Sequence, residues 1–114
     1  MRYAMAAAKP GGSDVIRKIE LGAMSPSAEE VLIRHEAIGL NFLDIYIRNG
    51  AYPWPVETDL VLGSEGAGVI EAVGNNVKGF AVGDRVVYTL ANGAYASHRS
   101  VSYTHLTLPT TPYV

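Results

Sequence analysis

The chain has 114 residues, of which 48% are hydrophobic and 18% are charged, a balance typical of one folded domain rather than of a disordered segment. The 9 basic and 11 acidic side chains leave a net charge of -2 and form no basic stripe, so nucleic acid is not expected as a partner. The absence of cysteine excludes disulfides and thiolate metal sites and fits a cytoplasmic protein. The apolar start is too short for a secretory signal, and no apolar run reaches the ~20 residues of a membrane span.

The first part of the chain predicts three strands separated by polar or glycine-rich turns. The expected order is a strand over 2–8, a turn over 9–14, a strand over 15–21, a loop over 22–29 and a strand over 31–38. The last of these strands has the clearest alternation, which would place Val31, Ile33 and His35 on one face.

A short helix is expected from Asn41 to about Arg48. Asn41 is a favoured N-cap residue, and Asp44 stands at the third helical position, where its carboxylate can accept a bond from the main chain of the cap. Phe42 and Ile45, with Ile47 as a further candidate, would form the apolar side of the helix. The Asn-Gly pair that follows tolerates the left-handed conformation and predicts the end of the helix.

The second part of the chain combines glycine-rich turns with short strands. The expected order is a glycine-dense stretch over 61–68, a strand over 68–73, turns over 74–76 and 82–84, and a hairpin of strands 85–90 and 94–100 around 91–93. Many short strands with short helices predict a mainly β domain built as a partly open barrel.

The last residues differ in composition from the rest. Residues 101–111 are rich in threonine and carry no Asp, Glu, Lys or Arg. Read back into codons, this stretch resembles the translation of a transposase adapter used in sequencing libraries. We therefore expect residues 101–114 to be a non-native tail, and we give no weight to its His105, Tyr103 and Tyr113.

Four motifs carry a resemblance to a known family. They are AIGLNFLDIYIRNGAYP at 37–53, LGSEGAGVIEAVG at 62–74, VGDRVVY at 82–88 and GAYASH at 93–98. Their order and spacing resemble the zinc-free quinone oxidoreductases related to zeta-crystallin, in the medium-chain dehydrogenase/reductase superfamily. The resemblance covers nearly all of residues 1–100. It implies a C-terminally truncated catalytic domain with a GroES-like fold over 1–100, and a homodimeric parent protein. It also implies NADPH or NADH as hydride donor and a quinone or other α,β-unsaturated carbonyl as acceptor.

Two positions separate this chain from the zinc enzymes of the same superfamily. Asn41 stands where those enzymes have a cysteine ligand, and Ser64 stands where they have a histidine. Neither residue type is a usual zinc ligand, and His35, His98 and His105 show no ligand spacing. We therefore expect no catalytic zinc. Quinones accept hydride without a Lewis acid, which agrees with that expectation.

Five residues are candidates for the site. By resemblance, Asn41 reaches the nicotinamide end of the cofactor, and Asp44 and Arg48 are further cofactor-binding candidates; alternatively, Asp44 only caps the helix and pairs with Arg48. Tyr46 and Tyr52 are the catalytic candidates, because a tyrosine ring can stack on a quinone and its hydroxyl can stabilise a developing oxyanion. Their alternative role is packing alone.

The glycine-dense stretch is not expected to bind phosphate. Residues 63–68 have the spacing G-x-x-G-x-G, not the dinucleotide pattern G-x-G-x-x-G, and they precede a strand. The glycines are expected to allow close packing of the main chain. Glu65 lies in this stretch as a carboxylate near the expected cleft, and Trp54 is expected to pack in its loop.

The sequence thus predicts the catalytic-domain portion of an NAD(P)H-dependent quinone oxidoreductase. The fold that binds most of the cofactor is expected to follow residue 100 in the natural protein, so the isolated chain is expected to be inactive. Two alternatives stay open. One is a zinc-free enoyl or alkenal reductase of the same superfamily, and the other is a non-enzymatic GroES-like binding domain.

Overall fold

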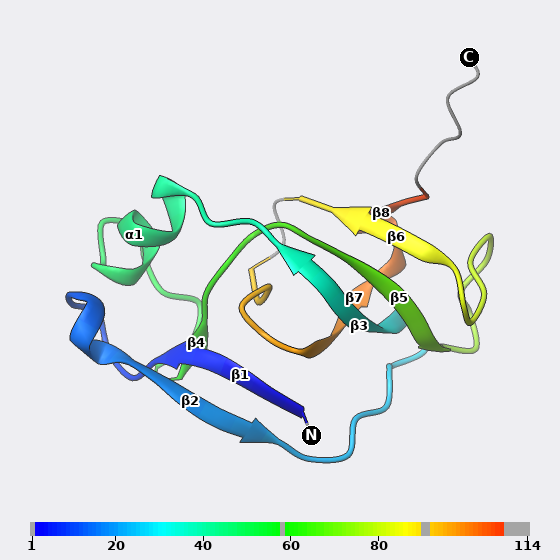
Figure 1. The fold of residues 1–114 in the computed structure, drawn as a ribbon, viewed down its shortest axis with the longest axis horizontal. Coiled ribbons are helices and arrows are strands. Elements are labelled where there is room, and N and C mark those ends of the chain that lie inside the picture. The colour runs from blue at the N-terminus through cyan, green and yellow to red at the C-terminus, as the bar shows by residue number, and fades with distance from the viewer. Residues whose placement is uncertain (1, 58, 90–91, 109–114) are drawn as a thin grey trace.

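The computed structural model describes residues 2–57, 59–89 and 92–108 (Figure 1). Within these residues the chain forms eight strands, one α-helix and two 3₁₀ turns. The strands are β1 (Arg2–Ala7), β2 (Ile16–Leu21), β3 (Glu30–Ile38), β4 (Leu60–Val61), β5 (Gly66–Val73), β6 (Arg85–Tyr88), β7 (His98–Ser102) and β8 (Leu106–Thr107). The helix is α1 (Phe42–Arg48), and the 3₁₀ turns are Ser13–Val15 and Tyr103–His105. No helix among the described residues has the length and apolar character that a membrane crossing requires.

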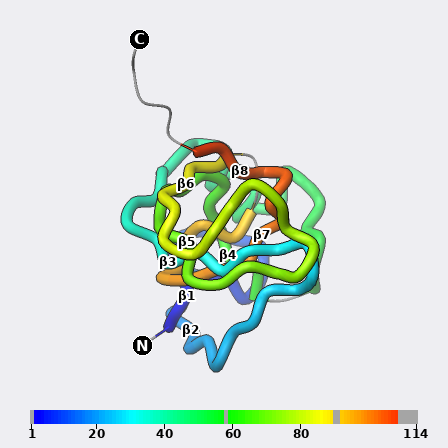
Figure 2. Tube along the Cα trace, turned by 90° about the vertical axis from the view of Figure 1, so that its right-hand side faces the viewer, coloured from blue at the N-terminus to red at the C-terminus, as the bar shows by residue number. Residues whose placement is uncertain are grey.

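The strands form two antiparallel sheets. The smaller sheet has the order β2-β1-β4, and the larger has the order β7-β3-β5-β6-β8. In both views β1 and β2 of the smaller sheet lie below the larger sheet (Figures 1 and 2). A bridge between Ala4 and Ala96 joins β1 to the segment before β7. The prediction of a mainly β, partly open barrel is confirmed.

The main core lies on the larger sheet, where β3, β5, β6 and β7 contribute side chains. Its buried residues are Val31, Ile33, Ile70, Val86, Tyr88, Ala94, Val101 and Leu106. Ile33 and Ile70 are paired across β3 and β5, and both are almost fully buried. A smaller cluster of Ala7, Leu60 and Leu62 has Ile47 of α1 packed against it. This smaller cluster therefore anchors the helix to the three-stranded sheet.

The glycine-dense stretch packs against neighbouring main chain, as predicted. Gly68 lies in β5 opposite His35 of β3. A Cβ at Gly68 would overlap with the main-chain carbonyl of Arg34 and would lie 2.8 Å from Cγ2 of Ile33. Only glycine therefore lets β3 and β5 approach this closely.

The predicted hairpin of strands 85–90 and 94–100 is wrong. β6 pairs with β5 and β8, whereas β7 pairs with β3 at the opposite edge of the sheet. The intervening segment is bound elsewhere, because the N–H groups of Gly93 and Ala94 donate to the carbonyl of Gly63 and that of Tyr95 donates to Leu62. Leu90 and Ala91 of the predicted hairpin lie outside the described residues.

The threonine-rich end of the chain joins the larger sheet over its described part. β7 crosses the predicted boundary at residue 100, and β8 adds an edge strand to β6. Val101 and Leu106 are buried in the main core, and Tyr103 makes an edge contact with Phe80. Threonine and branched apolar residues fit a pleated sheet whatever their coding origin. The non-native origin of residues 101–114 stays a prediction, and Tyr113 lies outside the described residues.

Candidate active site

The start of α1 is closed by main-chain and carboxylate hydrogen bonds. Asn41 has the extended conformation of an N-cap residue. Its main-chain N–H donates to Oδ2 of Asp44 at 3.0 Å, and the N–H of Asp44 donates to the Asn41 carbonyl at 3.0 Å. The predicted cap is confirmed. At the other end, Gly50 has a φ of 89° as expected, while Asn49 keeps a right-handed helical conformation.

Asp44 is buried behind the helix start, with 3% of its surface exposed. Its Oδ2 also accepts a hydrogen bond from the Tyr95 hydroxyl at 2.8 Å. Its Oδ1 has no hydrogen-bond partner among the described residues. The predicted pair between Asp44 and Arg48 does not form within that part of the chain. Arg48 instead donates from Nε to the Gly11 carbonyl at 3.1 Å, which ties α1 to the turn after β1.

A cavity of about 570 Å³ opens at the start of α1. It is lined by Leu40, Asn41, Phe42, Ile45 and Tyr95. Leu40 is 76% exposed and Phe42 is 77% exposed, because Asp44 and Ile47 occupy the inner face of the helix. Of the residues predicted on the apolar side of α1, Phe42 and Ile45 therefore face this open cavity, whereas Ile47 packs against the smaller cluster.

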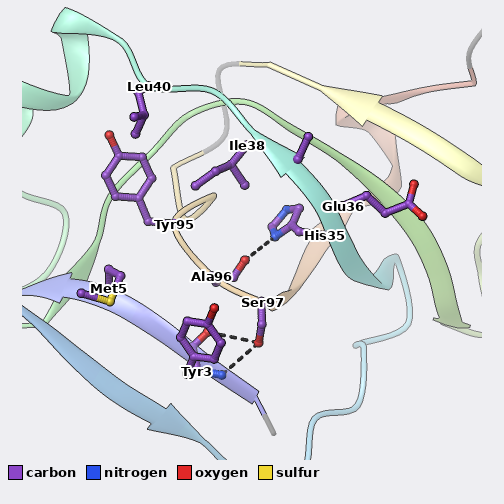
Figure 3. A pocket seen from close by; sticks show the side chains of 10 residues that line it. Tyr3, Met5, His35, Glu36, Ile38, Leu40, Tyr95, Ala96 and Ser97 are labelled. Carbon is purple, nitrogen blue, oxygen red and sulfur yellow. Dashed lines mark hydrogen bonds between the residues drawn. The ribbon is translucent and has the colours of Figure 1, made fainter.

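A second cavity, of about 530 Å³, lies between β1, β3 and the segment before β7 (Figure 3). Its lining includes Tyr3 and Met5 from β1, His35 and Ile38 from β3, and Ser97. Leu40 and Tyr95 line both cavities. In Figure 3 the ring of Tyr95 lies beside Leu40, between the strands and the start of the helix. The two cavities therefore share one wall.

His35 is locked into the sheet by both ring nitrogens. Nδ1 donates to the Ala96 carbonyl at 2.8 Å, so Nε2 is the acceptor for the Tyr88 hydroxyl at 2.7 Å. A Cβ on Gly66 would lie 2.9 Å from that hydroxyl and 3.0 Å from Nε2, so glycine is required there. Burial is the main cause that lowers the pKa of His35 and raises the pKa of Tyr88. His35 is therefore a neutral structural residue at the edge of the second cavity.

The lowered pKa of His35 predicts a loss of stability in mild acid. The unfolded histidine binds its proton near the ordinary pKa of 6.5, at a higher pH than the folded one. The contribution of neutral His35 to stability is therefore complete above about pH 6.5. It is lost as the pH falls from about 6.5 through the lower pKa of the folded state, by at most about 1.4 kcal/mol per pH unit. Urea unfolding at pH 7.5 and 5.5 should show a smaller acid-induced loss of stability in His35→Gln than in the unsubstituted chain. An identical loss in both would contradict this account.

The residues considered for zinc do not form a metal cluster. Ser64 is buried, and Asn41 lies at the first cavity. His98 contacts Glu71, with Nε2 and Oε1 3.5 Å apart, and Arg34 contacts the same carboxylate at 3.3 Å. Among the described residues, no three His, Asp or Glu side chains gather closely enough to hold a metal ion.

Tyr46 and Tyr52 are half exposed, at 49% and 50%, and line neither of the two cavities. Within the described part of the chain, neither hydroxyl makes a hydrogen bond, so both are available to a ligand. Their catalytic role stays a prediction. Trp54 packs against the small cluster and donates from Nε1 to the Ile47 carbonyl at 2.7 Å, which confirms its packing role.

Sequence reasoning missed Tyr95 as a site residue. It stands inside the motif GAYASH, but its hydroxyl meets Asp44 across 51 positions of the chain. Helical spacing pointed to Arg48 as the partner of Asp44, since those two residues are one turn apart. Only the tertiary arrangement brings Tyr95 to the start of α1.

Residues 27–109 match the profile of the alcohol dehydrogenase GroES-like domain. This chain belongs to that family. The GroES-like domain is 44% identical over 95 residues to a quinone oxidoreductase of Salmonella typhimurium, an alignment that covers 82% of this chain and 29% of that protein. Its relatives thus include quinone oxidoreductases of the medium-chain dehydrogenase/reductase superfamily, and the predicted resemblance is confirmed.

Solved structures agree with this assignment. A quinone oxidoreductase of Pseudomonas syringae superposes on the GroES-like domain with a TM-score of 0.91 and 37% identity, over 100% of this chain and 35% of that one. The Escherichia coli quinone oxidoreductase complexed with NADPH gives a TM-score of 0.88 and 37% identity, over 93% of this chain and 32% of that one. The chain spans about a third of the length of these relatives.

Proposed function

We propose that this domain is the catalytic domain of an NAD(P)H-dependent quinone oxidoreductase that works without zinc. The observation that carries the proposal is the cavity at the start of α1. Leu40, Phe42 and Ile45 give it apolar walls, and Asn41 adds one amide that can donate and accept hydrogen bonds. A concave apolar site with few polar groups suits a flat, weakly polar ligand. Quinone rings and nicotinamide rings both have that character.

The residues of the cavity fit the nicotinamide part of a cofactor. The amide of Asn41 matches a carboxamide in both its donor and its acceptor, while Leu40 and Phe42 can cover the faces of a ring and exclude water. When bound, a reduced nicotinamide supplies hydride. We assign most of the binding of NADPH or NADH, and the choice between them, to parts of the enzyme beyond this domain. The parent enzyme is proposed to be a homodimer.

Four further residues have proposed roles. Asp44 is buried behind Asn41, so it would act on the cofactor through that residue. Arg48 would offer its positive charge to anionic groups of the cofactor. By the resemblance to the quinone oxidoreductases, Tyr46 and Tyr52 are proposed to contact the quinone, and their hydroxyls have no partner within the described chain. A hydroxyl that donates to the carbonyl oxygen would stabilise the negative charge that develops there as hydride arrives.

The tyrosine proposal predicts a loss of turnover when either hydroxyl is removed. Tyr46→Phe and Tyr52→Phe keep the ring and remove one donor each. In the intact reductase, each change is expected to lower kcat for a benzoquinone by about tenfold, which corresponds to about 1.4 kcal/mol. Tyr3→Phe is the matched control, because Tyr3 is also partly exposed but lies on β1. Unchanged kcat in both site variants would assign Tyr46 and Tyr52 to packing alone.

The choice of acceptor is tested by steady-state kinetics on the intact reductase. We expect kcat/KM with NADPH to be higher for a benzoquinone than for an alkenal. The reverse order would favour an enoyl or alkenal reductase. Turnover of neither acceptor would favour a binding domain without enzymatic activity.

We further propose that residues 101–114 are not native and that the isolated 114-residue chain has no reductase activity. Sequencing the source DNA across the codons for Ser100 to Thr111 tests the first part. We expect the natural reading frame to continue into a strand, a glycine-rich turn and a helix. A genuine threonine-rich end followed by a stop codon would contradict both the proposal that residues 101–114 are not native and the proposed enzymatic function. NADPH oxidation by the purified chain would contradict the second part.

A further inference from the structure

The main chain of Tyr95 is held on both sides by hydrogen bonds. Its N–H donates to the Leu62 carbonyl at 2.8 Å, and its carbonyl accepts from the N–H of Met5 at 2.7 Å. Its ring lies against Gly63, where a Cβ would collide with it. The segment before β7 is therefore fixed to β1 and to the chain after β4, and the Tyr95 ring points toward the start of α1.

The Tyr95 hydroxyl ends at the buried carboxylate that closes the helix. It donates to Oδ2 of Asp44, and the same oxygen accepts the main-chain N–H of Asn41. One oxygen atom thus joins the segment before β7 to the residue whose amide lines the first cavity. Three of the four motifs noted in the sequence meet here, through Gly63, Tyr95 and the start of α1.

We infer that Tyr95 is a positioning residue of the reductase, which fixes the Asn41 side chain in the cavity by holding Asp44. This inference rests on the proposed function, because it assigns Asn41 to the cofactor or substrate. The Tyr95 hydroxyl is committed to Asp44 and therefore acts through that carboxylate instead of donating to a ligand.

The electrostatics of the pair agree with this role. Burial is the largest cause that raises the pKa of Tyr95 far above its ordinary value of 10, and the hydrogen bond to Asp44 adds to it. The hydroxyl therefore keeps its proton throughout the neutral range and remains a donor to Asp44. A catalytic proton donor would need a pKa near the working pH, which this tyrosine does not have.

Tyr95→Phe separates the hydrogen bond from the packing, since it keeps the ring against Gly63 and in the wall of both cavities. We expect the main-chain N–H of Asn41 in the 114-residue chain to exchange its hydrogen about tenfold faster, because the helix start opens more often. In the intact reductase we expect kcat for a benzoquinone to fall about tenfold, with its KM unchanged within about twofold, since orientation is lost and not binding.

Tyr88→Phe is the matched control, because it also removes a tyrosine hydroxyl that donates to one acceptor inside the protein, here Nε2 of His35. It should leave both hydrogen exchange at the main-chain N–H of Asn41 and kcat for the benzoquinone unchanged. Asp44→Asn tests the same link if Tyr95→Phe does not fold, and it should also speed exchange at Asn41. Unchanged exchange in Tyr95→Phe, or an equal effect in Tyr88→Phe, would overturn the inference.

The exchange measurement needs no turnover, so the two proposals can fail separately. Faster exchange at Asn41 with an intact reductase that reduces no quinone would overturn the proposed function, and with it the role of Tyr95 in reduction. A tenfold loss of kcat in Tyr95→Phe without any change at Asn41 would leave the proposed function standing and overturn the positioning role.

Discussion

Replacing Gly63 by alanine is expected to lower the free energy of unfolding by about 2–5 kcal/mol. Two costs add at this position. Gly63 has a φ of 90°, a left-handed conformation that residues with a Cβ adopt at a cost. The new methyl group would also collide with the Tyr95 ring and would lie 3.0 Å from Cβ of Ala94. The main chain of both neighbours is fixed by hydrogen bonds to Leu62 and Gly63, so relieving the collision requires the Tyr95 ring or these segments to shift.

Gly79→Ala is the control that separates these two costs. Gly79 has a similar φ of 85°, but no atom lies within 4 Å of an added Cβ. Its replacement is expected to cost only the conformational part, about 1–2 kcal/mol. Urea unfolding with equal m-values measures both variants. Equal losses of unfolding free energy at Gly63 and Gly79 would show that the Tyr95 ring moves freely. That result would contradict a fixed position of Tyr95 in the wall that the two cavities share.

Replacing Ile33 by alanine is expected to lower the free energy of unfolding by about 2–5 kcal/mol. Ile33 is fully buried in the centre of the larger sheet, and its partner across β5 is Ile70. The strands on either side are held in register by their ladders, so the surrounding chain closes only part of the space that the side chain leaves. The remaining cavity adds its cost to the lost burial of apolar surface.

Ile38→Ala makes the same chemical change at the end of the same strand. Ile38 is only partly covered, so its truncation should cost less than about 1 kcal/mol. Thermal or urea unfolding of the two variants checks the difference. A loss of unfolding free energy at Ile38 as large as that at Ile33 would contradict the partial exposure of Ile38 at the end of β3.

Most of the individual elements were predictable because their signals are local. The strand over 31–38 and the helix from Asn41 follow from periodicity and from a cap that spans four residues. The partner of each strand is not a local property. The hairpin prediction failed because residues 92–97 bond to Gly63, Leu62 and β1, which directs β7 to β3. The alternation expected in β3 is interrupted by register shifts, and Val31, Leu32 and Ile33 are all buried.

The site residues likewise differ in whether local sequence signals predict them. Asn41 and Asp44 could be found from the sequence, because a cap residue and its third helical position are recognisable by spacing. Tyr95 could not be found, since its contact with Asp44 depends on how β4, β1 and the segment before β7 meet. The partnership of Asp44 with Arg48 was a reasonable expectation from helical spacing, but Gly11 binds that arginine. The roles of Tyr46 and Tyr52 stay predictions.

The most direct test of the proposed chemistry is NADPH oxidation by the intact reductase after exhaustive dialysis against a zinc chelator. The measured quantity is kcat/KM for a benzoquinone before and after dialysis. We expect the two values to agree within about twofold, because the start of α1 offers an amide and apolar walls for hydride transfer to a quinone. Loss of activity on dialysis and its return with added zinc, or no quinone-dependent oxidation at all, would contradict the account.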